Sequence, residues 1–245
     1  MTPSDLAAIV APVLDDALLG FDVDGVLAPI VEHADDSRLS PGVGKALAAL
    51  AERTTVAILS GRSLESLERL FEFPSGLHVI GSHGIEIRGA GPLVLDDDEQ
   101  HTFDQLEILG TRAAQVAGQG AWLEYKPASI VLHTRSADQE KAARAVEALS
   151  NFARVITGAE VKTGQHVVEL LARSASKGEA LMALALRLER SPVVFLGDDL
   201  TDEDAFRMMG PSDISVRIGP GDTAARFRLN GPDEVAEFIR IHAFA

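Results

Sequence analysis

The 245-residue chain contains no cysteine. This absence excludes disulfide bonds, zinc sites with thiolate ligands and cysteine nucleophiles, and it fits a reducing compartment. No apolar run approaches the roughly 20 residues that a membrane-spanning helix needs. The first residues, Met1–Leu6, also lack the basic region of a signal peptide. We therefore expect a soluble, cytoplasmic protein with no membrane partner.

Basic residues are also scarce. The chain has 22 lysines and arginines against 37 aspartates and glutamates, which gives a formal net charge of −15. This charge disfavours nucleic acid and anionic membrane surfaces as partners. It would also repel a phosphorylated substrate, so a site for one needs local cations. Because 46% of the residues are hydrophobic, we expect a globular chain with one large domain or two small ones, and we expect a monomer.

The first and last parts of the chain alternate short apolar runs with helical patterns. The apolar runs suit buried strands and lie at residues 18–22, 54–59, 77–80, 193–196 and 214–218. The helical patterns lie at residues 4–14, 41–50, 64–71, 177–190, 201–209 and 233–244. This alternation predicts an α/β fold with a doubly wound parallel sheet. We also expect a hairpin over residues 85–95, and helix caps at Ser4 or Asp5 and at Thr201.

The pattern changes after the acidic run at residues 96–99. Helical patterns at 102–117 and 138–152 are combined with short strands at 122–126, 129–133, 155–157 and 166–170. Short strands separated by glycine turns are typical of a separate small α+β unit. We therefore predict a core domain of residues 1–99 and 173–245, interrupted by an inserted α+β unit at residues 100–172.

The first apolar run ends in two aspartates, Asp22 and Asp24, followed by Gly25. On a strand these side chains share a face, because side chains alternate with a period of two. Two like charges this close raise each other's pKa unless a cation holds them. The pair therefore indicates a metal or a shared proton. An Asx turn with both carboxylates in solvent is the plain alternative.

Other predicted strands also end in polar residues. Ser60 and Gly61 follow the second strand, Asp198 and Asp199 follow a later one, and Asp202 and Lys177 belong to helices beside it. The carboxyl ends of parallel strands lie on one edge of a sheet. Each residue also has a plain role: Ser60 as a helix cap, Lys177 as a surface lysine, and the aspartates as acids at a helix N-terminus.

Phosphoryl transfer explains the whole set at once. It needs an in-line nucleophile, neutralisation of the phosphoryl oxygens and help for the leaving oxygen. A carboxylate can act as the nucleophile, and an acidic cluster of oxygen ligands suits Mg²⁺. Lys177 and the Ser60 hydroxyl would offset the charge of the phosphate. The sequence therefore predicts a Mg²⁺-dependent enzyme that acts on a small phosphorylated molecule.

The same residues resemble the four motifs of haloacid-dehalogenase (HAD) phosphatases: Asp22-Val23-Asp24-Gly25, Ser60, Lys177 and Gly197–Asp202. Within that superfamily, further segments resemble the trehalose-6-phosphate phosphatase family, and they lie at residues 27–30, 59–62, 81–86, 124–126, 133–135, 168–169, 176–178 and 201–206. The resemblance covers nearly the whole chain. It implies a Rossmann-like HAD core, an inserted mobile cap and a phosphoric monoester hydrolase.

The resemblance also implies roles. Asp22 is the expected nucleophile, and Asp24 the acid that protonates the leaving sugar oxygen and then activates water, with Ser60 and Lys177 as further catalytic residues. Asp22, the backbone carbonyl of Asp24 and Asp198 are the expected Mg²⁺ ligands, assisted by Asp199 or Asp202. The expected substrate-binding residues are Gly61, Arg62, His83, Glu124, Lys126, His133, Arg135 and Glu169. Plain alternatives remain: Glu124 and Lys126 on an exposed strand face, His83 at a turn, and His133 as a structural residue of the cap.

The chain departs from the family pattern at two places. Val26 replaces the usual threonine at a position that should mainly pack. Leu171 and Ala172 replace a basic residue and a proline, and this segment bears on the choice of substrate. The expected reaction is hydrolysis of trehalose 6-phosphate through an aspartyl phosphate. The alternatives are a related sugar or pseudo-disaccharide phosphate, such as a sucrose-phosphate, mannosylglycerate-phosphate or aminocyclitol-phosphate type, a receiver-like phospho-acceptor signalling domain, and a catalytically silent binding module.

Overall fold

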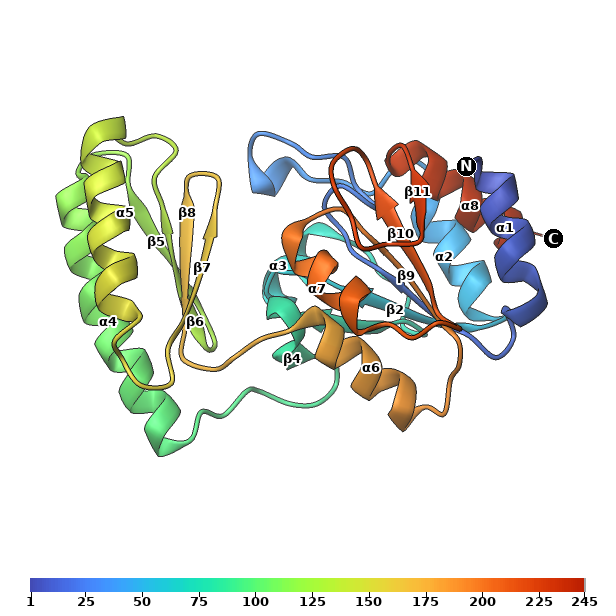
Figure 1. The fold of residues 1–245 in the computed structure, drawn as a ribbon, viewed down its shortest axis with the longest axis horizontal. Coiled ribbons are helices and arrows are strands. Elements are labelled where there is room, and N and C mark those ends of the chain that lie inside the picture. Colours follow the sequence, from blue (N-terminus) through green and yellow to red (C-terminus); the bar gives the residue numbers. More distant parts are fainter. Residues whose placement is uncertain (245) are drawn as a thin grey trace. The chain divides into compact units, whose positions relative to one another are not determined.

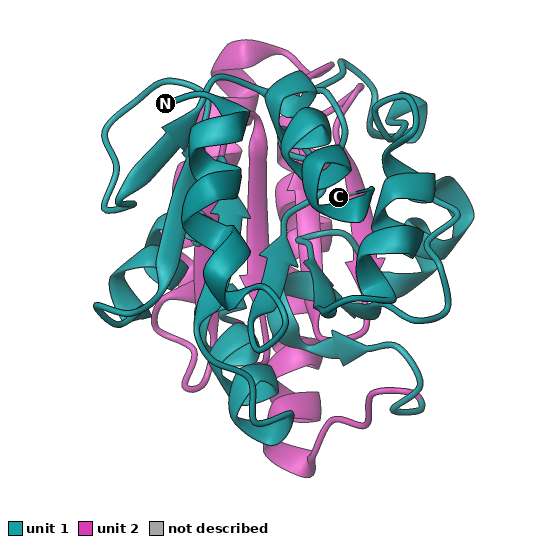
Figure 2. Cartoon of the chain, turned by 90° about the vertical axis from the view of Figure 1, so that its right-hand side faces the viewer, with its two compact units in different colours: residues 1–91, 176–245 teal, residues 92–175 magenta. Residues whose placement is uncertain are grey.

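A computed structural model describes residues 1–244, which form two compact units (Figure 2). Unit 1 comprises Met1–Gly91 and the chain from Ser176 onward, and unit 2 comprises Pro92–Ala175. Unit 2 therefore includes more of the chain than residues 100–172. Its two ends are joined by an ion pair, in which Arg173 Nε donates to Glu99 Oε1 at 2.6 Å.

Unit 1 is built on a seven-stranded sheet in the order β11-β10-β9-β1-β2-β3-β4 (Figure 1). Its strands are parallel except β4, which pairs with β3 antiparallel. The strands are β1 (Leu18–Phe21), β2 (Thr55–Leu59), β3 (His78–Gly81), β4 (Glu86–Ile87), β9 (Val193–Gly197), β10 (Ile214–Ile218) and β11 (Phe227–Leu229). The helices are α1 (Pro3–Val10), α2 (Val43–Ala51), α3 (Leu64–Leu70), α6 (Lys177–Arg187), α7 (Leu200–Met208) and α8 (Pro232–Ala243), with 3₁₀ turns η1 (Ala11–Val13), η2 (Ala34–Asp36) and η3 (Ser82–Gly84).

Helices cover both faces of this sheet. Alternate residues of β1 point to opposite faces, so Leu19 and Phe21 pack with one apolar cluster and Leu18 with another. The first cluster includes side chains of α1, α2, α3 and α8, and the second includes side chains of α6 and α7. This arrangement confirms the predicted doubly wound α/β core.

Unit 2 has its own antiparallel sheet, in the order β5-β6-β8-β7, and two helices (Figure 1). The elements are α4 (Asp97–Ala117), β5 (Trp122–Lys126), β6 (Ser129–His133), α5 (Gln139–Ala153), β7 (Glu160–Gly164) and β8 (Val167–Leu171). Side chains of α4 and α5 pack on one face of the sheet against Ile130, Leu132, Val168 and Leu170. The alternate strand residues form the other face, and this architecture confirms the predicted α+β character.

Two strand predictions were wrong, and one strand was not predicted. Residues 93–95 form no strand, because the partner of the segment at Glu86 and Ile87 is β3. Residues 155–157 form turns after α5, and the strand lies at β7 instead, paired with β8. No apolar run predicted β11, whose three residues pair with β10. Very short strands contain too few residues for the alternation of side chains between two faces to be recognised in the sequence.

The predicted helix starts were also wrong at three positions. Thr2 caps α1, Asp96 caps α4 and Asp199 caps α7. In each case the cap side chain accepts from the backbone N–H three residues later, and an aspartate or glutamate there bonds back to the cap residue. This reciprocal capping box satisfies two backbone donors that would otherwise lack partners. Acidic runs therefore start α4 and α7 earlier than the apolar spacing indicates.

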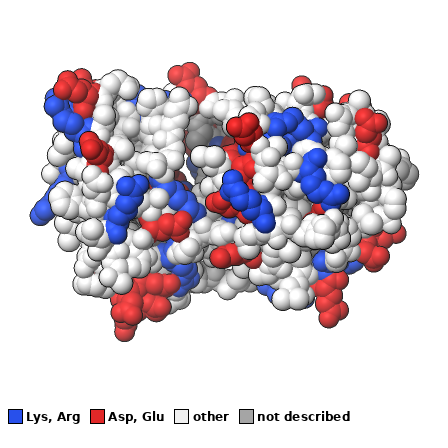
Figure 3. All heavy atoms as spheres, viewed as in Figure 1, with Lys and Arg blue, Asp and Glu red and all other residues white. Residues whose placement is uncertain are grey.

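Acidic and basic side chains are interspersed over the face of the molecule drawn in Figure 3. Among residues 1–244, no helix combines the length and the apolar character that a bilayer crossing needs.

Replacing Asp96 with alanine tests the corrected start of α4. Loss of the cap should lower the free energy of unfolding of unit 2 by about 1 kcal/mol. Urea denaturation followed by circular dichroism measures the change. Asp98→Ala is the matched control, because Asp98 lies in the same first turn but makes no capping bond. Equal destabilisation by the two substitutions would contradict the assigned cap.

Candidate active site

The carboxyl ends of β1 and β9 lie side by side and bring two predicted site residues together. The Asp22 N–H donates to the carbonyl of Leu196 at 3.0 Å, which extends the pairing of the two strands. Gly25 then turns the chain at a φ of +79°, and a Cβ on it would lie 2.0 Å from Asp198 Oδ2. Only glycine therefore lets the Asp22–Asp24 loop approach the Asp198 carboxylate this closely.

Lys177 is the centre of the site. It is the first residue of α6, and only 2% of its surface is exposed. Its Nζ lies 2.9 Å from Asp22 Oδ2, 2.9 Å from Asp202 Oδ1 and 4.0 Å from Asp199 Oδ1. A buried ammonium requires such partners. The plain alternative of a solvated surface lysine is therefore wrong.

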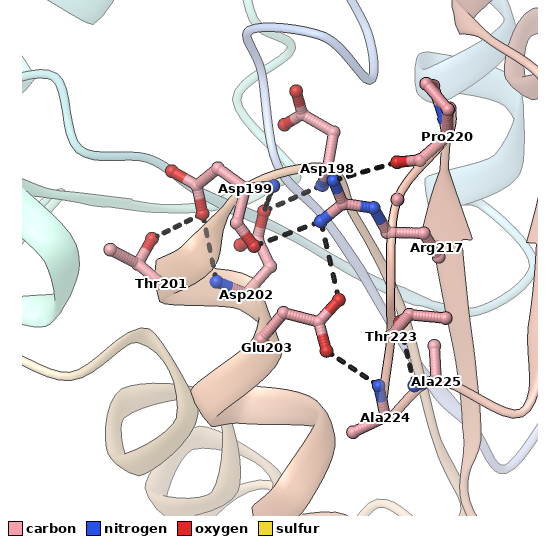
Figure 4. Close-up of polar contacts among 12 residues, drawn as sticks. Asp198, Asp199, Thr201, Asp202, Glu203, Arg217, Pro220, Thr223, Ala224 and Ala225 are labelled. Atoms are coloured by element: carbon pink, nitrogen blue, oxygen red, sulfur yellow. Dashed lines mark hydrogen bonds and ion pairs between the residues drawn. The ribbon is translucent and has the colours of Figure 1, made fainter. Parts of the chain in front are cut away.

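Asp202 fixes the loop after β9. Its Oδ2 accepts the backbone N–H groups of Asp198 at 2.8 Å and Asp199 at 3.1 Å. Asp199 in turn accepts from the Asp202 N–H at 3.0 Å and from the Thr201 hydroxyl at 2.8 Å (Figure 4). Gly197 is needed here, because a Cβ on it would lie 2.4 Å from the Asp202 side chain. Both oxygens of Asp202 are thus engaged by the protein.

The Asp198 carboxylate has a different environment. It points away from the Asp202 network in Figure 4, and no hydrogen bond from another part of the described chain reaches it. Oxygens of Asp22, Asp198 and Asp202 all lie within 4.8 Å of one another. Asp22 Oδ1 accepts the Val23 N–H at 2.7 Å and its Oδ2 faces Lys177, so Asp198 is the carboxylate of this group that is best placed to hold a cation.

The charges at the site do not balance. Burial, together with the charges of Asp202 and Asp199, raises the pKa of Asp198 to about 7. Burial opposes the charge of Lys177, but the carboxylates of Asp202 and Asp22 outweigh it and raise the lysine pKa well above its usual value. Four carboxylates face one ammonium, and carboxylate oxygens are ligands that Mg²⁺ accepts. This donor set fits the predicted Mg²⁺.

Asp24 faces a separate cation. Arg62 binds it with a two-pronged contact, Nε to Oδ2 at 2.6 Å and Nη2 to Oδ1 at 2.7 Å. The Ser37 hydroxyl also donates to Asp24 Oδ1 at 3.1 Å. Each aspartate of the Asp22–Asp24 pair thus has its own cationic partner, so no proton needs to be shared between them. Asp22 is buried, which argues against an Asx turn with both carboxylates in solvent.

Ser60 and His83 lie at the ends of β2 and β3. The buried Ser60 accepts the Arg62 N–H on its hydroxyl at 3.2 Å, and its carbonyl accepts the His83 N–H at 2.9 Å. The cap of α3 is Ser63, so the plain role of Ser60 as a helix cap is wrong. A Cβ on Gly61 would lie 2.5 Å from the His83 ring. His83 itself has a φ of +56°, a costly conformation that tends to occur at functional sites.

The predicted sugar-binding residues of unit 2 gather on the sheet face opposite α4 and α5. Lys126 Nζ lies 3.0 Å from Glu169 Oε1, which also accepts the Ser129 hydroxyl at 2.7 Å. His133 Nε2 lies 2.9 Å from Glu124 Oε2, and this hydrogen bond lowers the pKa of Glu124 despite burial. Arg135 is exposed in the turn after β6.

Several residues that support the site were not predicted from the sequence. Arg217 of β10 donates to the Asp199 carbonyl at 3.2 Å and lies 3.4 Å from Glu203 (Figure 4). Glu203 accepts the Ala224 N–H at 2.7 Å. The one available signal was a charged residue inside the apolar run at 214–218. Ser37 gave no signal, because it is 13 residues from Asp24 in the sequence.

Comparison with known proteins places this site in a family. A family model described as trehalose-phosphatase matches residues 20–233. The chain belongs to the trehalose-phosphatase family. The trehalose-phosphate phosphatases of Mycobacterium tuberculosis and Mycobacterium marinum are 35% identical over 238 residues and 33% identical over 234 residues, respectively. Each match covers 89% of this chain and 59% of the relative, so the chain spans about three fifths of their length.

Solved structures agree on the fold. The C-terminal domain of trehalose-6-phosphate phosphatase from C. albicans has a TM-score of 0.81 and 23% identity, covering 99% of this chain and 97% of that one. Trehalose-6-phosphate phosphatase from Aspergillus fumigatus has a TM-score of 0.67 and 25% identity, with coverages of 99% and 97%. The predicted HAD-type fold and the predicted family of phosphatases are therefore confirmed.

Replacing Gly25 with alanine should weaken Mg²⁺ binding by about tenfold or more, because the added Cβ displaces Asp198. Isothermal titration with Mg²⁺ measures the affinity. Gly42→Ala is the matched control: Gly42 has a similar φ of +81°, but nothing lies within 4 Å of its added Cβ. It should show a similar backbone cost of about 1–2 kcal/mol and unchanged Mg²⁺ affinity. Equal losses of affinity in both variants would contradict this role of Gly25.

Mg²⁺ binding should weaken as the pH falls through 7. The ion binds the ionised carboxylate, and the pKa of Asp198 is raised to about 7. Protons therefore compete below that value, and the dissociation constant should rise about fivefold or more from pH 7.5 to pH 6. Burial also raises the pKa of Asp22, the other expected ligand, well above its usual value, so some competition should persist above pH 7. Titration calorimetry across this range gives the profile. Asp198→Asn should bind weakly and lose the step near pH 7, whereas a flat wild-type profile would refute the assignment.

Proposed function

We propose that this chain is a Mg²⁺-dependent phosphatase that hydrolyses trehalose 6-phosphate to trehalose and phosphate. The observation that carries the proposal is the buried Asp22 carboxylate, held 2.9 Å from Lys177 beside the unengaged carboxylate of Asp198. Family membership and the relatives named above support the choice of substrate. We further propose that it acts as a monomer in the cytoplasm. The absence of cysteine fits this reducing compartment.

In the first step a carboxylate oxygen of Asp22 attacks phosphorus. A bond forms between Asp22 and phosphorus, and the bond from phosphorus to the sugar oxygen breaks. Asp24 gives its proton to that leaving oxygen. The step therefore yields an aspartyl phosphate and free trehalose.

In the second step Asp24 accepts a proton from water, which attacks the phosphorus of the aspartyl phosphate. The bond to Asp22 breaks, inorganic phosphate leaves, and both aspartates return to their starting states. A single carboxyl can serve both steps because the proton that it donates first is restored second.

Arg62 holds Asp24 through a two-pronged contact. Arg62 is also predicted to bind the substrate, and a phosphate is a strong partner for a guanidinium. Transfer of Arg62 from Asp24 to the phosphate would release the Asp24 carboxyl, which could then reach the leaving oxygen.

The remaining groups offset charge. Lys177 orients Asp22 and contributes a positive charge, and Ser60 offers its hydroxyl to a phosphoryl oxygen. Asp22 and Asp198, with the backbone carbonyl of Asp24, would hold Mg²⁺, while Asp199 and Asp202 fix the loop that carries Asp198. When bound, Mg²⁺ would neutralise negative charge on the phosphoryl oxygens.

Unit 2 would recognise the sugar. Glu124, Lys126 and Glu169 present carboxylates and an ammonium on one sheet face, and these groups are good partners for sugar hydroxyls. The departure at Leu171 and Ala172 has a structural place: Leu171 is buried at the end of β8, and Ala172 packs in the core of unit 2. Both are therefore accommodated by packing. A related sugar phosphate remains the second candidate substrate.

Phosphate release from a panel of sugar phosphates tests the proposal. The wild-type protein should release phosphate fastest from trehalose 6-phosphate, and EDTA should stop the reaction. Asp22→Asn should lower kcat by about 10³-fold or more, because it removes the nucleophile. Asp204→Asn is the control, since Asp204 is an exposed acid of α7 paired with Arg207, and it should retain full activity.

Each alternative gives a distinct result. Preference for another sugar phosphate would replace trehalose 6-phosphate as the substrate, and full activity of Asp22→Asn would refute the mechanism. A phosphorylated protein that persists for minutes would favour a receiver-like phospho-acceptor. Absence of turnover on the whole panel would favour a binding module.

A further inference from the structure

The only tryptophan of the chain, Trp122, lies on the same sheet face as the predicted sugar-binding residues. It is the first residue of β5, and side chains two residues apart on a strand share a face. Trp122, Glu124 and Lys126 thus form one row along β5. Successive members are separated by roughly 7 Å along the strand.

The indole is held rigidly on one side. Its ring stacks on the His133 imidazole with centroids 3.9 Å apart and planes 3° from parallel. His133 is in turn hydrogen-bonded to Glu124 at 2.9 Å. The orientation of the tryptophan is therefore linked, through one histidine, to a carboxylate that is proposed to bind sugar hydroxyls.

The other side of the indole is open. With one face on His133, the residue still exposes 54% of its surface. Leaving a large aromatic surface in water forgoes favourable burial. A pyranose ring has an apolar C–H face and a rim of hydroxyls. The flat indole can contact the C–H face, and the neighbouring carboxylate and ammonium can bind the hydroxyls.

We propose that Trp122 is a stacking platform for a glucose ring of the substrate, and that it selects for a disaccharide phosphate. This inference rests on the proposed function. The sheet face around Trp122 carries the carboxylates of Glu124 and Glu169 against the single ammonium of Lys126, so it suits the ring that carries no phosphate. Trp122 contacts its C–H face, while Glu124 and its neighbours bind its hydroxyls.

The alternative occupant of an exposed aromatic ring is another protein. The observations favour a sugar, because the surroundings of Trp122 on this face are the polar groups of Glu124 and His133 rather than further exposed apolar side chains. Tyr125, the other exposed aromatic residue of β5, shares the opposite face with Ile130. It exposes a similar 53% of its surface and therefore provides a matched control.

Intrinsic fluorescence reads this site directly, since Trp122 is the single tryptophan. We expect addition of trehalose 6-phosphate to the inactive Asp22→Asn protein, or of trehalose to the wild-type protein, to shift or quench the emission in a saturable manner. Glucose 6-phosphate, which lacks the second ring, should change it little. Unchanged emission at saturating trehalose 6-phosphate, with binding verified by calorimetry, would overturn the proposal.

Kinetics provide the second measurement. Trp122→Ala should raise the KM for trehalose 6-phosphate about five- to tenfold and leave kcat within about twofold. Trp122→Phe should restore most of the loss, and Tyr125→Ala should match the wild type. An unchanged KM in Trp122→Ala would overturn the proposal, as would an equal effect of Tyr125→Ala. Circular dichroism melting establishes that each variant is folded.

The two proposals fail in different ways. A wild-type protein that releases no phosphate from trehalose 6-phosphate refutes the proposed function, and the trehalose titration then still decides whether Trp122 stacks on a sugar. Normal turnover with silent fluorescence and an unchanged KM in Trp122→Ala refutes the platform alone.

Discussion

The buried ammonium of Lys177 is the interaction on which the site in unit 1 depends. It joins the start of α6 to the end of β1 through Asp22 and to the start of α7 through Asp202. Asp202 uses its second oxygen to hold the backbone of the loop that carries Asp198. One cation therefore sets the positions of two elements that are far apart in the sequence, and its removal would leave buried carboxylates without a partner.

The site nevertheless keeps an excess of negative charge, and that excess has a function in the proposed chemistry. A fully neutralised cluster would have no affinity for a divalent ion. Both carboxylate oxygens of Asp202 accept internal hydrogen bonds. The Asp198 carboxylate, in contrast, has a pKa raised to about 7 and accepts no hydrogen bond from the described side chains and amides. The protein thus separates the carboxylates that build the loop from those left to bind a cation.

The sequence predicted the strand ends well because hydrophobic runs and parallel-sheet topology are local and regular signals. It placed Asp22, Ser60, Lys177 and Asp198 at one edge of the sheet, but it gave no distances between their side chains. It could not show that Arg62 binds Asp24, since that contact joins side chains 38 residues apart and depends on rotamers. Short strands such as β11, and helices whose caps lie in acidic runs, were missed because hydrogen bonds rather than hydrophobic spacing determine them.

The second junction between the units lies between Ala175 and Ser176, directly before the lysine of the site. Ser176 caps α6, and Lys177 is the first residue of that helix. The first junction, at Gly91 and Pro92, follows β4 and adjoins none of the aspartates of the site. Changes of length are therefore easier to accommodate at the beginning of the inserted unit than at its end. At the second junction, an altered chain path would act directly on the cap of the helix that delivers the central cation.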